Sequence, residues 1–205
     1  INLFYNSQGV TQRPGILGTG WSFSDSYIQR DINYTINNTV DDESILVFEG
    51  SSYDLIYVNS EGRYHTKVET FLNVQNVSGG NNQNNDYWIV RTKDGTSYRF
   101  GFYNFSETVS NQYDYTWKWN LDLVNDTYGN SMFYNYTENP FPYDQGVAYL
   151  DSIEYNNDKT RKINFYYQSS DMRHLRTVYE NGNKITQSRM LQEIIVNVSN
   201  KMIRK

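Results

Sequence analysis

Few residues in this sequence have the types and spacing that metal or acid–base chemistry requires. The two histidines, His65 and His174, lie 109 positions apart, and neither belongs to a paired-ligand motif such as H-E-x-x-H. The triplet Asp41-Asp42-Glu43 offers oxygen ligands, but it lacks the spaced ligands and the glycine of a calcium-binding loop. We interpret this triplet as a solvated turn, and the sequence therefore predicts no metal site and no cofactor.

The sequence also contains no motif for a catalytic nucleophile or for nucleotide binding. The chain contains no cysteine, Ser22 lacks the G-x-S-x-G elbow, and no glycine-rich phosphate loop precedes a helix. The 23 acidic residues could bring two carboxylates together for glycoside hydrolysis, but no pattern selects a pair. We therefore expect that the protein is not an enzyme.

The four tryptophans are candidates for stacking on sugars if their rings are exposed. Aromatic rings on alternating strands more often belong to a core or a wall, which is the interpretation we favour. The four residues are Trp21, Trp88, Trp117 and Trp119.

The elements that position these residues must be β-strands. A single alanine, Ala148, stands against 20 tyrosines and 10 phenylalanines in 205 residues, and aromatic side chains suit a pleated surface. From Trp117 to Leu123 every odd position is apolar and every even position is polar, which predicts a strand with one buried and one wet face. The same alternation predicts strands near residues 21–36, 44–48, 53–58, 67–74, 87–92, 97–103, 116–124, 131–137, 148–155, 162–167, 174–179 and 184–198.

Tight turns connect these strands and indicate antiparallel hairpins. Asp94-Gly95 lies between two alternating segments and is a strong hairpin signal, because both residues tolerate positive φ. No segment between the strands has the length or composition of an interdomain linker. We therefore predict one continuous all-β unit over residues 1–205, with a sub-boundary near residues 104–114.

Charge and hydropathy exclude two classes of partner. A net charge of −5 argues against a nucleic-acid partner, and the basic cluster Lys201, Arg204 and Lys205 is interpreted as a solvated end. No apolar run approaches the roughly 20 residues that a helix needs to span a membrane.

Asparagine gives the only indication of where the protein is located. Seven N-x-[ST] triplets are candidate N-glycosylation sites, which favours a secreted or cell-surface protein. About four such triplets are expected by chance in a chain this rich in asparagine, serine and threonine. The seven are Asn33, Asn37, Asn76, Asn104, Asn125, Asn135 and Asn197.

The order of several motifs resembles that of the RHS or YD-repeat proteins, and within them the shell region of the SpvB-like and TcB-like subunits of bacterial toxin complexes. The segment from Gly18 through Gly20 to Trp21 is similar to the G-x-G-W turn at the start of that region. Asp94-Gly95 belongs to a similar D-G-x-x-Y-x-F pattern. The most specific match begins at Trp119 and continues through the D-x-x-G-N-x-x-x-Y-x-Y core of a YD unit, formed by Asp126, Gly129, Asn130, Tyr134 and Tyr136.

The resemblance implies an antiparallel sheet of hairpin repeats that curves and spirals into a hollow shell, which often encloses the C-terminal part of the same polypeptide. This chain would then be a non-enzymatic shell segment of a larger toxin-complex-like protein. It departs from the family in lacking the Asp-Pro signature of the autoproteolytic region, since its prolines are Pro14, Pro140 and Pro142.

The last predicted strand should leave a sheet edge unpaired near Leu191 to Val198. Exposed edges recruit strands, so we expect this edge to contact the remainder of the polypeptide or a neighbouring subunit. Two alternatives remain open. One is an extracellular glycan- or receptor-binding adhesin, and the other is a surface filament subunit that assembles by strand addition.

Overall fold

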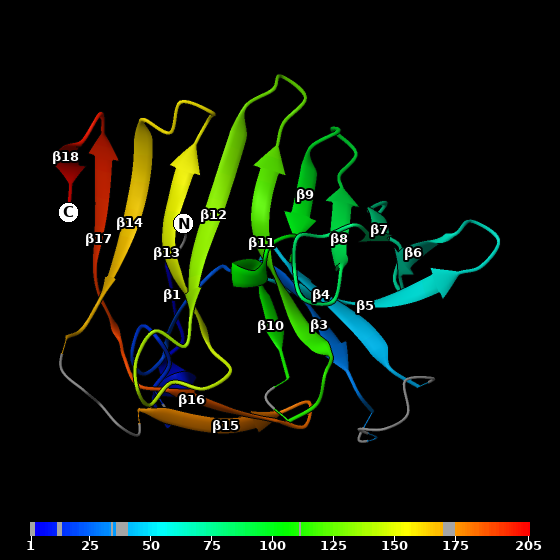
Figure 1. Cartoon of the computed structure of the whole chain (residues 1–205), viewed down its shortest axis with the longest axis horizontal. Helices are drawn as coiled ribbons and strands as arrows, with labels where there is room; N and C mark the ends of the chain where they lie inside the picture. The colour runs from blue at the N-terminus through cyan, green and yellow to red at the C-terminus, as the bar shows by residue number, and fades with distance from the viewer. Residues whose placement is uncertain (1–2, 12–13, 34, 36–40, 111, 170–174) are drawn as a thin grey trace.

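The computed structural model describes residues 3–11, 14–33, 35, 41–110, 112–169 and 175–205. These residues form strands and two short 3-10 helices, as the composition predicts (Figure 1). The elements are β1 (Leu3–Tyr5), η1 (Ser7–Thr11), β2 (Trp21–Phe23), β3 (Tyr27–Asp31), β4 (Glu43–Phe48), β5 (Ser51–Val58), β6 (Arg63–Thr66), β7 (Asn73–Ser78), β8 (Asp86–Arg91), β9 (Ser97–Phe100), η2 (Asn104–Ser106), β10 (Glu107–Val109), β11 (Thr116–Asn125), β12 (Ser131–Glu138), β13 (Ala148–Tyr155), β14 (Arg161–Tyr167), β15 (Arg176–Glu180), β16 (Asn183–Gln187), β17 (Leu191–Val198) and β18 (Lys201–Arg204).

The main sheet is antiparallel throughout its described pairings, and its N-terminal part closes on itself. Strands β3 to β9 follow one another as neighbours, and β11 pairs with both ends of that series. Lys118 to Asn120 of β11 pair with β3, whereas Leu121 to Asn125 pair with β9 on the opposite edge. The result is a closed, barrel-like ring of antiparallel strands, and the predicted all-β fold with a curved antiparallel sheet is confirmed.

The long strand β11 also starts an open sheet. Beyond the segment that pairs with β3, residues Leu123 to Asn125 pair with β12 along the same edge. From there the order runs β12, β13, β14, β17 and β18, which form the left half of the molecule in Figure 1. The ring and the open sheet are therefore joined through β11, which belongs to both.

Each part has its own hydrophobic core. In the ring, alternate residues of the strands point inward, and the indoles of Trp88 and Trp119 meet edge to face with ring centroids 5.8 Å apart. The open sheet buries a smaller cluster around Leu150, Ile153 and Phe165. Tyr134 packs against both clusters, so an aromatic wall residue joins the two cores.

A buried carboxylate holds the connection between β9 and β10 against β11. The Asp122 side chain has no exposed surface and accepts hydrogen bonds from Arg99 Nε at 2.6 Å, from the Phe102 backbone N–H at 2.6 Å and from Ser106 Oγ at 2.8 Å. Burial raises the Asp122 pKa, while the Arg99 charge and these hydrogen bonds act in the opposite direction. These interactions fix a segment of the chain that leaves the ladder between two strands.

Several of the predicted strands are divided or shortened in the structure. Residues 21–36 contain β2 and β3, which pair with different neighbours. Residues 67–72 form a loop in which Phe71 has φ 61°, so β7 begins only at Asn73. In the stretch 184–198 the chain leaves β16 at Ser188, whose N–H and Oγ both donate to Asp144 Oδ1 instead of to a neighbouring strand. Side-chain acceptors distant in sequence compete with the ladder at this point, and local alternation does not reveal them.

Candidate functional site

The outer edge of the open sheet lies one strand further along the chain than the sequence predicts. The expected edge near Leu191 to Val198 is β17, which pairs with β14 on one side and β18 on the other. The chain reverses at Ser199 and Asn200, with φ 47° and 64°, as a tight hairpin turn requires. Strand β18 is therefore the terminal strand of the described sheet.

Strand β18 covers only part of its neighbour. It pairs with Val196 to Val198. Of the other β17 residues, Leu191 donates its N–H to the Ile16 carbonyl, and residues 192–195 have no ladder partner on that side among the described strands. Met202 and Ile203 are 61% and 64% exposed. An incompletely paired edge with exposed apolar side chains can accept a further strand.

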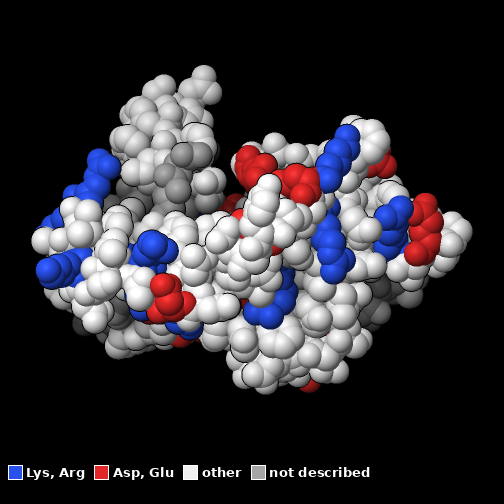
Figure 2. Space-filling model, turned by 90° about the horizontal axis from the view of Figure 1, so that it is seen from above, with Lys and Arg blue, Asp and Glu red and all other residues white. Residues whose placement is uncertain are grey.

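Basic residues accompany this edge. Lys201, Arg204 and Lys205 lie on or directly after β18, and Lys205 Nζ is 2.7 Å from the Glu193 carboxylate of β17. Figure 2 shows blue side chains at the end of the molecule where Figure 1 places β18. The cluster interpreted as a solvated end is thus part of the sheet edge.

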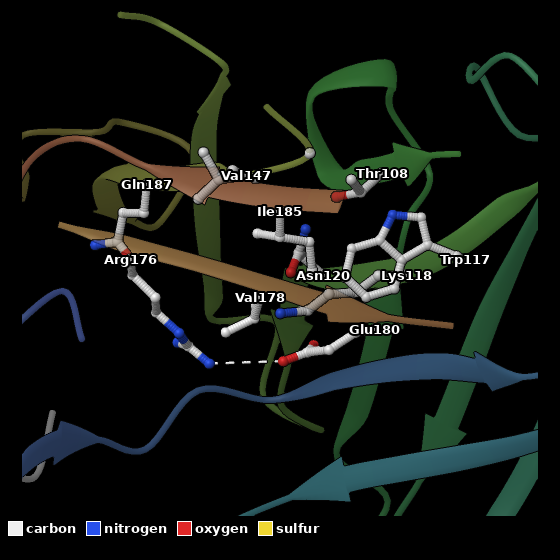
Figure 3. A pocket seen from close by; sticks show the side chains of 12 residues that line it. Thr108, Trp117, Lys118, Asn120, Val147, Arg176, Val178, Glu180, Ile185 and Gln187 are labelled. Atoms are coloured by element: carbon white, nitrogen blue, oxygen red, sulfur yellow. Dashed lines mark ion pairs between the residues drawn. The ribbon is translucent and has the colours of Figure 1, made fainter. Parts of the chain in front are cut away.

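A second region of interest lies beneath the β15–β16 hairpin. These two strands pair with each other and cross one end of β11, enclosing a cavity of about 130 Å³ (Figure 3). Trp117, Lys118 and Asn120 reach this cavity from β11, while Arg176 and Glu180 face it from β15. The Arg176 guanidinium lies 3.5 Å from the Glu180 carboxylate.

A larger cavity of about 490 Å³ shares Lys118, Asn120, Ala148 and Arg176 with the smaller one. It is enclosed by residues 15–26, by ring strands and by the first strands of the open sheet. Its walls are mostly apolar and aromatic. The polar face of β11, which alternation predicts to be wet, is therefore covered by the β15–β16 hairpin and by the N-terminal segment.

A third cavity brings two acidic residues together that the sequence could not select. Glu107 and Glu138 both line a space of about 370 Å³ between the β10 segment and the end of β12. Reduced hydration raises the Glu138 pKa to about 7, and the Glu107 charge adds to this effect. Asp144 also lines this space. The Glu107 carboxylate accepts a hydrogen bond from Thr116 Oγ1, and the Asp144 carboxylate accepts one from the Ser188 N–H. Within the described residues there is no group of three or more side chains suited to hold a metal ion.

The residues of the family-like motifs occupy turns and walls. Gly18 and Gly20 have φ 92° and 78°, and a Cβ on Gly20 would lie 2.9 Å from the Asn6 carbonyl oxygen. The Trp21 ring packs against the Tyr5 ring at a tilted angle of 44°, with ring centroids 5.0 Å apart.

The two Asp-Gly-type turns are stabilised by their own aspartates. The Asp94 carboxylate accepts from the Thr96 N–H at 3.1 Å, next to Gly95 at φ 87°. Asp126 accepts from the backbone N–H and the side-chain amide of Asn130 at 2.8 and 2.7 Å, with Gly129 at φ 86° between them.

The remaining motif residues are aromatic. Trp119 lies in the core of the ring, while Tyr134 and Tyr136 line the larger cavity. The Tyr136 hydroxyl donates to the Leu121 carbonyl at 2.9 Å, and burial raises its pKa well above the ordinary value. Of the four tryptophans only Trp21 is substantially exposed, at 47%, so the other three do not form an exposed sugar-stacking platform.

The candidate glycosylation sites differ in accessibility. Asn76 and Asn104 are exposed, whereas Asn33, Asn125, Asn135 and Asn197 are half-buried. The Asn33 and Asn135 side-chain amides donate to the Asp41 carbonyl and to Ser152 Oγ. Asn37 lies outside the described residues.

Comparison with known proteins identifies the fold. No family model and no curated protein matches the sequence. The N-terminal domain of the effector protein SpvB from Salmonella typhimurium strain LT2 is similar in structure, with a TM-score of 0.69 at 17% identity, covering 95% of this chain and 81% of that one. The chain therefore has the same fold as this SpvB domain.

Two larger assemblies contain a similar domain. TcdB2-TccC3 has a TM-score of 0.71 at 14% identity, and the Photorhabdus luminescens Tc holotoxin pore has 0.69 at 13%. This chain is covered to 94% in both cases but spans only 12% of each of those chains. Within the described residues no helix has the length and hydrophobicity needed to cross a membrane.

Proposed function

We propose that this chain is a non-enzymatic shell segment of a larger, secreted or cell-surface protein of the RHS/YD-repeat type, which encloses or presents another polypeptide. The observation that carries the proposal is the outer edge of the open sheet. A sheet that ends on a short, exposed strand, and leaves half of the preceding strand unpaired, is incomplete as a wall. The structural likeness to toxin-complex proteins supports the same conclusion.

The partner at this edge is a β-strand of the remaining polypeptide or of a neighbouring subunit. Strand addition would satisfy the outward backbone groups of β18 and cover Met202 and Ile203, which are otherwise in water. The basic residues around the edge favour a partner strand with acidic side chains at the opposing positions. The exposed sequons Asn76 and Asn104 support an extracytoplasmic location.

Amide hydrogen exchange on the native, full-length protein tests this proposal. The outward N–H groups of β18 should exchange slowly in the intact protein and rapidly in residues 1–205 alone. Single proline substitutions at Lys201 and Met202, which precede the register shift at Ile203, separate the two sides of the strand, since successive N–H groups of a regular strand point in opposite directions. One variant should release the partner strand while the pairing with β17 persists; Tyr179→Ser, at an exposed position on β15, is the control. Equal exchange of β18 in both forms would refute the proposal.

A glycan-binding adhesin is the second candidate, and a specific observation favours it. Trp21 and Tyr5 form an exposed aromatic pair on the β1–β2 hairpin, next to the exposed side chains Leu3 and Phe4. A glycan array with Trp21→Ala as the matched variant tests this function. Specific binding that disappears in the variant would support the adhesin, and an array without specific signals would exclude it.

A further inference from the structure

Two donor side chains, Lys118 and Asn120, project from one face of β11. Lys118 and Asn120 are two residues apart on the strand, so their side chains point to the same side. Asn120 is only 6% exposed, and its Nδ2 group has no hydrogen-bond partner among the described residues. A buried donor without an acceptor destabilises the fold, and folded proteins usually satisfy such groups with water or a ligand.

Lys118, two residues before Asn120 on the same strand, is half-buried. Within the described part of the chain its amine donates no hydrogen bond and has no carboxylate oxygen within 4 Å; the Nζ atom lies 3.8 Å from the centroid of the Tyr27 ring. Burial lowers the Lys118 pKa, and the more distant charges of Asp25 and Glu180 only partly oppose this effect. Figure 3 shows the Lys118 side chain extending into the cavity beneath β15.

The space in front of these donors has the size of a small-molecule site. The cavities of about 130 and 490 Å³ meet at Lys118 and Asn120, and the larger one falls within the usual range of roughly 300–1,000 Å³. Phe23, Phe48 and Leu150 contribute to its apolar wall. One end of the cavity is thus polar and rich in donors, and its body is apolar.

The charges around the cavity restrict the ligand further. The Arg176 guanidinium lies 3.5 Å from the Glu180 carboxylate, which partly offsets its charge. Asp25 and Glu49 also line the larger cavity, but neither is within ion-pair distance of Lys118. The free hydrogen-bonding capacity at this end therefore belongs to donors, which select an acceptor group on the ligand.

We propose that this cavity binds a small amphipathic carboxylate, whose oxygens accept hydrogen bonds from Lys118 Nζ and Asn120 Nδ2 while its apolar body lies in the larger cavity. Charge-assisted hydrogen bonds of this kind are roughly twice as strong as neutral ones. This site is independent of the proposed shell function, because it rests only on the two cavities beside β11 and not on the sheet edge at β18.

Calorimetry with octanoate and 1-octanol on the full chain tests the site. Octanoate should bind at least about tenfold more tightly than 1-octanol, because only the carboxylate satisfies both donors. The carboxylate pairs with the protonated amine, so octanoate affinity should fall as the pH is raised and Lys118 loses its proton. Equal affinity for the two probes, or no binding of octanoate, would overturn the proposal.

Two substitutions locate the site. Asn120→Asp keeps the shape of the side chain but replaces the donor with a negative charge, and Lys118→Met removes the amine; each should weaken octanoate binding by about tenfold or more. Lys93→Met, at an exposed lysine, is the matched control and should bind octanoate like the unmodified protein. Unchanged affinity in folded Asn120→Asp would contradict the assignment even if Lys118→Met does not fold.

Discussion

Removing the positive charge that accompanies the buried Asp122 carboxylate should destabilise the protein strongly. In Arg99→Met the 2.6 Å hydrogen bond from Arg99 Nε disappears, and the Asp122 side chain, which has no exposed surface, keeps only the donors Phe102 N–H and Ser106 Oγ. Breaking a buried pair on one side costs about 3–5 kcal/mol, and the partial exposure of Arg99 favours a value of about 3 kcal/mol at neutral pH.

Urea unfolding measures this loss directly. With a slope of about 2–3 kcal/mol per molar urea for a chain of this size, the midpoint should fall by about 1 M. Arg63→Met, which removes an exposed pair with Glu61, is the control and should cost at most about 1 kcal/mol.

The pH dependence of this loss tests the electrostatic cause. Burial already raises the Asp122 pKa in the folded state, and removal of Arg99 raises it further. A carboxyl with a raised folded pKa binds its proton more tightly in the folded than in the unfolded chain, so acidification stabilises the variant relative to its value at neutral pH. The difference between variant and unmodified protein should therefore shrink as the pH falls and the carboxyl becomes neutral. A loss below about 1 kcal/mol, or one that does not change with pH, would refute the reasoning.

Three further predictions concern packing and ionisation. Gly101→Ala should cost at least about 3 kcal/mol in urea unfolding, because its Cβ would lie 2.2 Å from the Trp119 ring at a positive φ, whereas Gly129→Ala, with open space around it, should cost only about 1–2 kcal/mol. Ile153→Ala should cost about 2–5 kcal/mol by opening a cavity in the core of the open sheet, and a cost below 1 kcal/mol would contradict that packing. Burial raises the Tyr134 pKa to about 12, so Tyr134→Phe should remove an absorbance change near that pH; loss of a step near pH 10 would argue against its burial.

Local chemistry was sufficient to predict most of the strands and several of their turns. At Asp94 and Asp126 the aspartate carboxylate binds amides within the same turn, so short sequence motifs specify the reversal. In β11 the alternating apolar residues Trp119 and Leu121 do enter the core of the ring. Periodicity of this kind is readable because each residue's environment repeats with the strand.

Non-local contacts explain what the sequence did not reveal. The pairing of β9 with β11 closes the ring, and the local sequence of neither strand specifies this pairing partner. Lys118 and Asn120 occupy polar positions that alternation assigns to solvent, but the β15–β16 hairpin covers them. The sheet edge lies at β18 and not at β17, because the Ser199-Asn200 turn adds one more short strand. Such a short strand has too few residues for its alternation to be recognised in the sequence.

The structure of the intact native protein, determined by cryo-electron microscopy, tests the shell assignment most directly. We predict an additional strand hydrogen-bonded to the outer side of β18, continuing the wall around an interior that holds another polypeptide. A native assembly in which Met202 and Ile203 remain in solvent, with no strand beside them, would contradict the assignment.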